Sequence, residues 1–99
     1  MIAYKLFRVM KDGSISSLFI NKRKRYEKNV WLIAEFIPTK GFAKRFGWHS
    51  THSPYAPHLS MKGRVWFKVE IEDYDKIERP LSQGGTWYIS KKLKILDEI

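Results

Sequence analysis

The stretch 64–72 is the feature that most constrains this fold, because its apolar residues recur at every second position. The apolar set is Val65, Phe67, Val69 and Ile71, and it alternates with Arg64, Trp66, Lys68, Glu70 and Glu72. Side chains of a β-strand point to opposite faces in turn, so this period predicts a strand with one buried face. Such a strand needs a sheet around it to cover that face.

Other segments have strand-like patterns, namely 3–10, 14–20, 30–37, 48–51, 86–89 and 92–95. Asp12-Gly13 separates the first two and predicts a hairpin turn. A short helix is the alternative for 30–37, since periodicity over eight residues does not separate a strand from a helix. Ser53 and Pro54 predict the start of a short helix, as N-cap and first helical residue. Residues 73–85 are expected to form a long connection.

These elements predict an α+β fold, mostly β, over residues 1–99. We expect a single compact domain with a curved, mainly antiparallel sheet and one or two short helices. The chain has 99 residues and no cysteine, which excludes disulfides, thiolate metal sites and thiol nucleophiles. The N-terminus alternates instead of forming an apolar run, so we expect a cytoplasmic protein with no signal peptide and no membrane span.

The charge of the chain is strongly positive and unevenly distributed. Lys and Arg number 19 against 10 Asp and Glu, a formal net charge of +9. Residues 1–68 hold 14 basic and 3 acidic residues, whereas residues 69–99 hold 5 basic and 7 acidic residues. The first two-thirds of the chain are therefore predicted to present a positive field to a polyanion.

A basic run between the second and third predicted strands is the sharpest local signal. Clustered cations neutralise phosphates and release counterions, which predicts nucleic-acid binding without sequence preference. Tyr26 beside the run could stack on a base. The alternative is a solvated loop, and the pattern does not separate DNA, RNA and an acidic protein surface. The predicted contact residues are Lys22, Arg23, Lys24, Arg25, Tyr26, Lys28, Lys44 and Arg45.

The segment 47–58 gathers all three histidines with hydroxyl and aromatic residues. No Asp, Glu or Cys in it completes a zinc site or orients a His–Ser pair, so neither a metal nor a catalytic residue is predicted. A small-ligand pocket fits the composition better. Its candidate residues are Arg8, Trp48, His49, Ser50 and Tyr55. Gly84-Gly85 is read as a hairpin turn, and no cofactor is expected.

Several short motifs resemble those of small uncharacterised proteins encoded by tailed bacteriophages and prophages. They are Tyr4-Lys5-Leu6-Phe7-Arg8-Val9, Gly47-Trp48-His49, Ala56-Pro57-His58-Leu59, Gly63-Arg64-Val65-Trp66 and Gln83-Gly84-Gly85-Thr86-Trp87. The resemblance covers most of the chain and implies a phage or mobile-element origin, with no assigned activity.

The order of elements also resembles a minimal ADP-ribosyltransferase domain. In that likeness Arg8 matches the arginine of the first strand, and Ser50-Thr51 matches the hydroxyl strand motif. The stretch that corresponds to the catalytic glutamate, residues 83–87, contains no acid. The likeness therefore implies a domain that binds without catalysing ribosyl transfer.

Together these observations predict a small, basic, non-enzymatic binding protein that contacts nucleic acid through Lys and Arg. One alternative is a phage-type inhibitor that binds an acidic surface of a host or defence protein. Another is a small-ligand or nucleotide-binding domain. A homodimer is compatible with an exposed strand edge.

Overall fold

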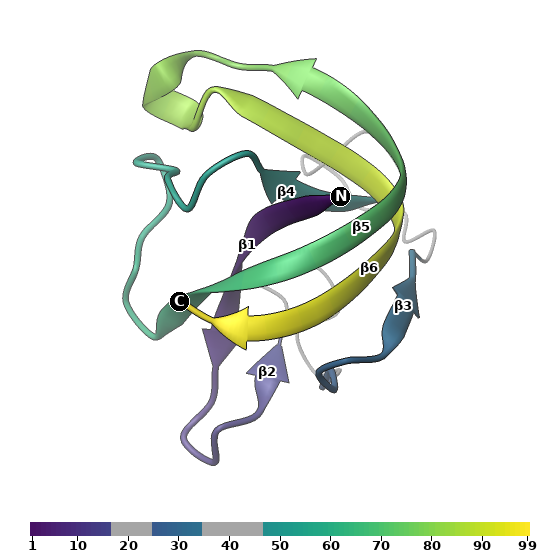
Figure 1. Ribbon diagram of the computed structural model, residues 1–99. Helices are drawn as coiled ribbons and strands as arrows, with labels where there is room; N and C mark the ends of the chain where they lie inside the picture. The colour runs from purple at the N-terminus through teal and green to yellow at the C-terminus, as the bar shows by residue number, and fades with distance from the viewer. Residues whose placement is uncertain (17–24, 35–46) are drawn as a thin grey trace, which may run out of the picture.

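The computed structural model describes residues 1–16, 25–34 and 47–99 (Figure 1). Over these residues the regular secondary structure is almost entirely antiparallel strand, with one short 3₁₀ turn, η1. This confirms the mostly β class and the single compact domain that the sequence predicts. The elements are β1 (Ile2–Val9), β2 (Ile15–Ser16), β3 (Trp31–Ile33), β4 (Trp48–Thr51), β5 (Arg64–Glu78), η1 (Leu81–Gln83) and β6 (Thr86–Glu98).

Four of the strands form a closed ring around the core. β1 pairs with β5, β5 pairs with β6, β6 pairs with β4, and β4 returns to β1 through one residue pair, Tyr4 with Thr51. β2 extends the sheet beside β1, and β3 extends it beside the second half of β6. Figure 1 shows β5 and β6 curving together around the other strands.

The long hairpin of β5 and β6 is bent, and the bend lets both strands surround one core. Asp73 in β5 has a positive φ of 52°, a conformation that is rare outside glycine. On β6, Tyr88 and Leu93 both belong to the core although their positions differ in parity. In a regular strand, residues of different parity point to opposite faces. β6 must therefore turn one face toward the core at Tyr88 and the other face at Leu93.

The core is built from the inward face that the alternating pattern predicts. Phe67, Val69 and Ile71 of β5 are buried, as are Ala3 and Phe7 of β1. The rings of Phe7 and Phe67 meet edge to face with centroids 5.7 Å apart, a favoured aromatic geometry. Burial of these side chains is the main force that holds the two strands together.

The predicted hairpin after the first strand is confirmed. Met10 N donates to Ser14 O at 2.9 Å, and Gly13 takes a φ of 84° that a glycine accepts without steric cost. Of the predicted return strand 14–20, the structure describes Ile15 and Ser16 as β2; residues 17–20 lie outside the described residues. The third predicted strand appears as β3, and residues 35–37 lie outside the described residues as well.

The helix predicted at Ser53 and Pro54 is wrong. Residues 52–60 form bends and turns, in which Tyr55 N donates to Ser53 O and Leu59 N donates to Ala56 O. The Thr51 hydroxyl donates to Ser53 O and fixes a turn at the position of the expected cap. Pro57 has no N–H, so a helix that began at Pro54 would lack a bond in its first turn.

The predicted boundaries in the last third of the chain are also wrong. β5 continues to Glu78 through the acidic stretch that was expected to be a connection, and β6 runs unbroken from Thr86 to Glu98. Pairing with β6 holds this stretch extended, with Asp75 opposite Ile89 and Glu78 opposite Thr86. A partner strand therefore outweighs the low strand propensity of the acidic residues.

Candidate functional site

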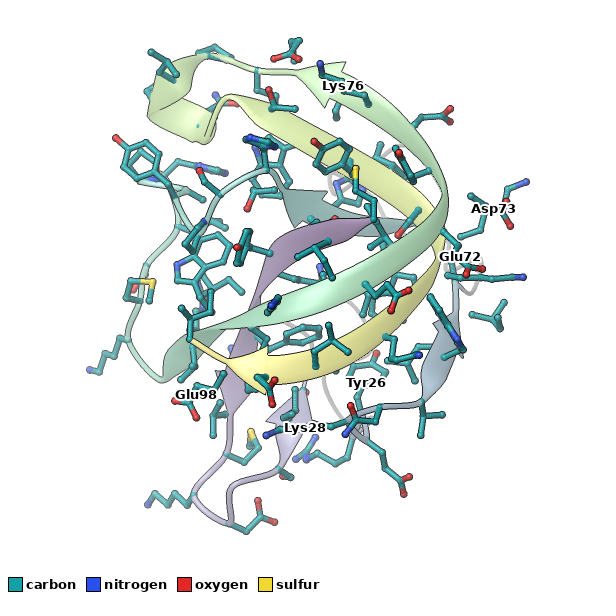
Figure 2. All side chains as sticks on the ribbon, viewed as in Figure 1. Tyr26, Lys28, Glu72, Asp73, Lys76 and Glu98 are labelled. Carbon is teal, nitrogen blue, oxygen red and sulfur yellow. The ribbon has the colours of Figure 1, made fainter. Side chains whose placement is uncertain are left out.

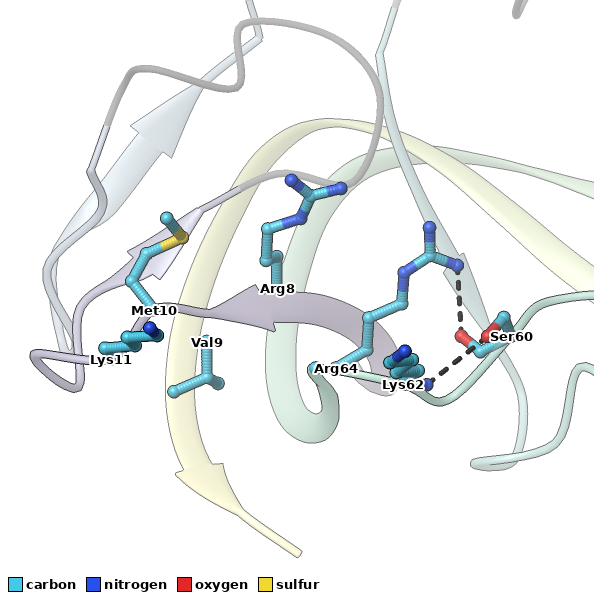
Figure 3. Close-up of a pocket in the computed structure, with 8 residues that line it drawn as sticks. Arg8, Val9, Met10, Lys11, Ser60, Lys62 and Arg64 are labelled. Atoms are coloured by element: carbon cyan, nitrogen blue, oxygen red, sulfur yellow. Dashed lines mark hydrogen bonds between the residues drawn. The ribbon is translucent and has the colours of Figure 1, made fainter.

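An open groove of about 500 Å³ lies beside the end of β1, and the charged residues described in its lining are basic (Figure 3). Arg8 and Lys11 line it from β1 and the hairpin turn, and Lys62 and Arg64 line it from the turn that leads into β5. The remaining lining residues are Val9, Met10, Ser60 and Gly63. Among the residues that the structure describes, four cations and no carboxylate line the groove, which favours a positive field there.

The pairing of β1 with β5 brings the two halves of the groove together. In this register Arg8 is directly opposite Arg64, and Val9 N donates to Gly63 O at 3.1 Å. Gly63 has a φ of 69°, which turns the chain sharply into β5. The Arg64 guanidinium donates to Ser60 O at 3.0 Å, so it is oriented along one wall.

Two like charges in directly opposed positions repel each other and destabilise a sheet. Figure 3 shows the side chains of Arg8 and Arg64 extending from the same side of their strands. An anion placed between the two guanidinium groups would attract both of them and so offset their mutual repulsion. Guanidinium groups suit such an anion well, because their planar N–H donors match the oxygens of a phosphate or carboxylate.

Two acidic residues of β5 lie opposite lysines of β6. Glu70 lies opposite Lys94, and Glu72 lies opposite Lys92 in the register of β5 with β6. Figure 2 shows Glu72 together with Asp73 on the outside of the bend in β5. Opposed unlike charges attract across strands, so Glu70 and Glu72 have cationic neighbours within the sheet.

Arg25, from the predicted basic run, lies next to the hairpin turn. Its Nε donates to the Ser14 hydroxyl at 3.1 Å. Ser14 in turn donates through Oγ and N to Asp12 Oδ1, at 2.6 and 3.0 Å. These hydrogen bonds from Ser14 hold the pKa of the Asp12 carboxyl below its usual value, and Arg25 adds a smaller effect in the same direction. Asp12 therefore organises the turn as an anion.

Of the other basic residues predicted to contact nucleic acid, the structure describes Lys28 and leaves five outside the described residues. Lys28 is exposed, and its Nζ lies 5.8 Å from the centroid of the Phe67 ring. Figure 2 places Lys28 near the lower edge of the molecule, below β6. Lys22, Arg23, Lys24, Lys44 and Arg45 lie outside the described residues.

Tyr26, predicted as a stacking platform, packs its ring against the core. Its centroid lies 5.3 Å from that of Trp48 and 6.3 Å from that of Phe7, both edge to face. Tyr26 N also donates to Ile15 O at 3.0 Å. A base could stack on Tyr26 only over the part of the ring that these contacts leave exposed.

The five residues of the predicted ligand pocket do not share one site. Arg8 lies in the basic groove, whereas Trp48 and Ser50 occupy alternate positions of β4 on its inward face. His49 lies on the opposite face of the same strand by alternation. Tyr55 is 54% exposed in the turn that follows β4.

Lys5 is a functional candidate that the sequence reasoning did not single out. It lies between Ala3 and Phe7 in β1, on the face that forms the core, and it is half-buried. Its Nζ donates to His49 O at 2.7 Å, and desolvation lowers its pKa to about 8. The alternation of β1 carries the signal, since positions 3, 5 and 7 must face the same way.

Within 1–16, 25–34 and 47–99 no three His, Cys, Asp or Glu side chains come together as metal ligands would. Over the same residues, no helix has the length and apolar character that crossing a membrane requires. Comparison of the chain with models of protein families, with curated proteins and with solved structures finds no match. The chemistry of the groove is therefore the basis on which a function can be argued.

Proposed function

We propose that this protein binds nucleic acid through its phosphates, with the basic groove of Arg8, Lys11, Lys62 and Arg64 as one contact surface. The observation that carries the proposal is the composition of that groove, whose described lining has four cationic residues and no acidic one. Phosphate contacts of this kind supply most of the affinity of proteins that bind without sequence preference.

The charge balance of the chain supports a polyanion as the partner. Residues 1–68 carry an excess of 11 basic residues, and all four cationic residues of the groove belong to this part. The remaining predicted contacts, Arg25 and Lys28 among the described residues, belong to it as well. The proposed role is a binding one, without catalysis, and the resemblance to small phage proteins suggests a host cytoplasm as the setting.

The test is binding of single-stranded and double-stranded oligonucleotides, measured by fluorescence anisotropy over a range of salt concentrations. We expect log K to fall linearly with log salt, with a slope of about −4 to −5 on duplex DNA if about five phosphates are contacted. The double variant Arg8→Gln/Arg64→Gln should reduce the steepness of that slope by about 2, since two phosphate contacts are lost.

The matched control is Lys76→Gln/Lys91→Gln, which removes the same charge from exposed positions of β5 and β6. This control should leave the slope close to that of the wild type. A slope that changes equally in both double variants would show that only total charge matters and would reject the groove as a contact surface. Absence of binding near 50 mM salt would reject nucleic acid and favour an acidic protein surface as the partner.

A further inference from the structure

The ring of strands has a weak point between β1 and β4, and Lys5 occupies it. These strands pair only at Tyr4 with Thr51. Continued antiparallel pairing would place Lys5 opposite Ser50, but the ladder stops before that position. Instead the Lys5 ammonium donates to His49 O at 2.7 Å, so a side chain satisfies a carbonyl at the point where the strands separate.

Three buried polar atoms near this point have no hydrogen-bond partner within the described part of the chain. They are Trp48 Nε1, Ser50 Oγ and Ser90 Oγ. Ser50 and Ser90 are completely buried. Burying a polar atom without a hydrogen-bond partner is costly in a folded protein.

The unpartnered atoms and the Lys5 ammonium belong to one region of the interior. Trp48 packs against the core and lies directly opposite Ser90, while Ser50 lies two residues further along the same face. Paired residues of neighbouring strands point to the same side of a sheet. Lys5 Nζ lies 5.9 Å from the centroid of the Trp48 ring, which links the lysine to this cluster.

The cluster combines one cationic group, the Lys5 ammonium, with neutral hydrogen-bonding groups. Desolvation lowers the pKa of Lys5, whereas a neighbouring carboxylate would raise it; among the described residues no carboxylate does so. An ammonium and an indole N–H can donate hydrogen bonds but cannot accept them, and hydroxyls can rotate to donate. The ligand that fits such a donor set is therefore an acceptor with a negative charge.

We propose that Lys5, Trp48, Ser50 and Ser90 form a binding site for a small carboxylate. The Lys5 ammonium is the counter-ion of the ligand, and the indole N–H and the two hydroxyls donate hydrogen bonds to its oxygens. The rings of Phe7 and Trp48, both within 6 Å of Lys5 Nζ, provide an apolar wall for a short aliphatic chain. The site is independent of the proposed nucleic-acid surface, since none of its residues lines the basic groove.

A purely structural role for Lys5 explains less of the arrangement. Closing the gap between β1 and β4 accounts for the hydrogen bond to His49 O, but it leaves Trp48 Nε1, Ser50 Oγ and Ser90 Oγ unsatisfied. Alanine at positions 50 and 90 would fill a closed core equally well without a desolvation cost. A bound carboxylate would account both for the buried Lys5 ammonium and for the unpartnered donors of Trp48, Ser50 and Ser90.

In the test, the full chain is titrated with formate, acetate and propionate. Chloride at the same ionic strength serves as the reference anion. Binding is followed through the indole N–H resonance of Trp48 and through the melting temperature, which rises when a ligand binds the folded state. We expect saturable binding of at least one carboxylate and none of chloride. Linear, non-saturating shifts with every carboxylate would overturn the proposal.

Substitutions in the cluster test whether the carboxylate binds there. Lys5→Met should abolish saturable binding, and Lys68→Met, which removes an exposed lysine from β5, should leave it unchanged. Ser90→Ala and Ser50→Ala should each weaken binding about tenfold, without lowering the melting temperature of the free protein. Unchanged carboxylate affinity in both serine variants would overturn the proposal even if Lys5→Met failed to fold. Nucleic-acid binding by the serine variants should equal that of the wild type, which separates this site from the groove.

Discussion

The Nζ atom of Lys5 lies 2.7 Å from the carbonyl oxygen of His49, across the point where β1 and β4 stop pairing. The fold thus places an ammonium group on the inward face of a strand, among aromatic rings. Charged groups in such surroundings lose hydration, and their pKa values respond. The pKa of Lys5 accordingly falls from 10.5 to about 8.

This shift predicts that the protein becomes more stable as the pH rises from about 8 to about 10.5. In that window the unfolded chain still holds the Lys5 proton and the folded chain has lost it, so raising the pH favours folding. The contribution is about 3 kcal/mol, as expected for a shift of this size. Urea denaturation of wild type and Lys5→Met at pH 7 and pH 10 measures it, since other titrating groups are common to both proteins. Parallel pH profiles would contradict the prediction.

The register that places Arg8 opposite Arg64 predicts a like-charge repulsion between these two side chains. Arg8→Gln should raise the free energy of unfolding by a few tenths of a kcal/mol at low salt, because one member of an opposed like-charge pair is removed. A double-mutant cycle with Arg64→Gln should give a repulsive coupling that fades at about 1 M salt. An attractive coupling would show that an unrecognised anion or carboxylate already bridges the pair.

The contacts of Tyr26 predict a structural role that can be separated from any role in binding. Tyr26→Ala removes a ring that packs on Trp48 and Phe7, and we expect a loss of about 2–4 kcal/mol in the free energy of unfolding. Tyr26→Phe keeps the ring and should lose much less. Chemical denaturation of the two variants checks this, and a Tyr26→Ala variant as stable as wild type would be incompatible with the packing described.

Two glycines with similar backbone angles should respond differently to alanine. Gly13 and Gly84 have φ values of 84° and 96°. A Cβ at Gly84 would lie 2.7 Å from Tyr55 O and 3.0 Å from Trp87 Nε1, whereas a Cβ at Gly13 meets nothing within 4 Å. Gly13→Ala should cost about 1–2 kcal/mol for the left-handed conformation alone, and Gly84→Ala distinctly more. Equal losses on thermal denaturation would show that the turn after η1 moves to accept a side chain.

Alternation and turn chemistry predicted much of the fold correctly. The inward face of β5 follows from Val65, Phe67, Val69 and Ile71, and the β1–β2 hairpin follows from Asp12-Gly13. These features are local, because the period of a strand and the backbone preference of a turn depend on neighbours in the chain. The helix expected at Ser53 is wrong although the competing features are also local, since the Thr51 hydroxyl donates to Ser53 O and the spacing of Pro54 and Pro57 favours a turn.

What the sequence determined by itself is the strand-rich class, the hairpin and the concentration of positive charge in residues 1–68. Only the tertiary structure decided which residues meet. Arg8 faces Arg64, Lys5 reaches His49, and Ser90 lies beside Trp48 because β1, β4, β5 and β6 close into a ring with a particular register. The physical reason is that a period of two assigns each side chain to a face, while the partner across that face is set by pairing between distant strands.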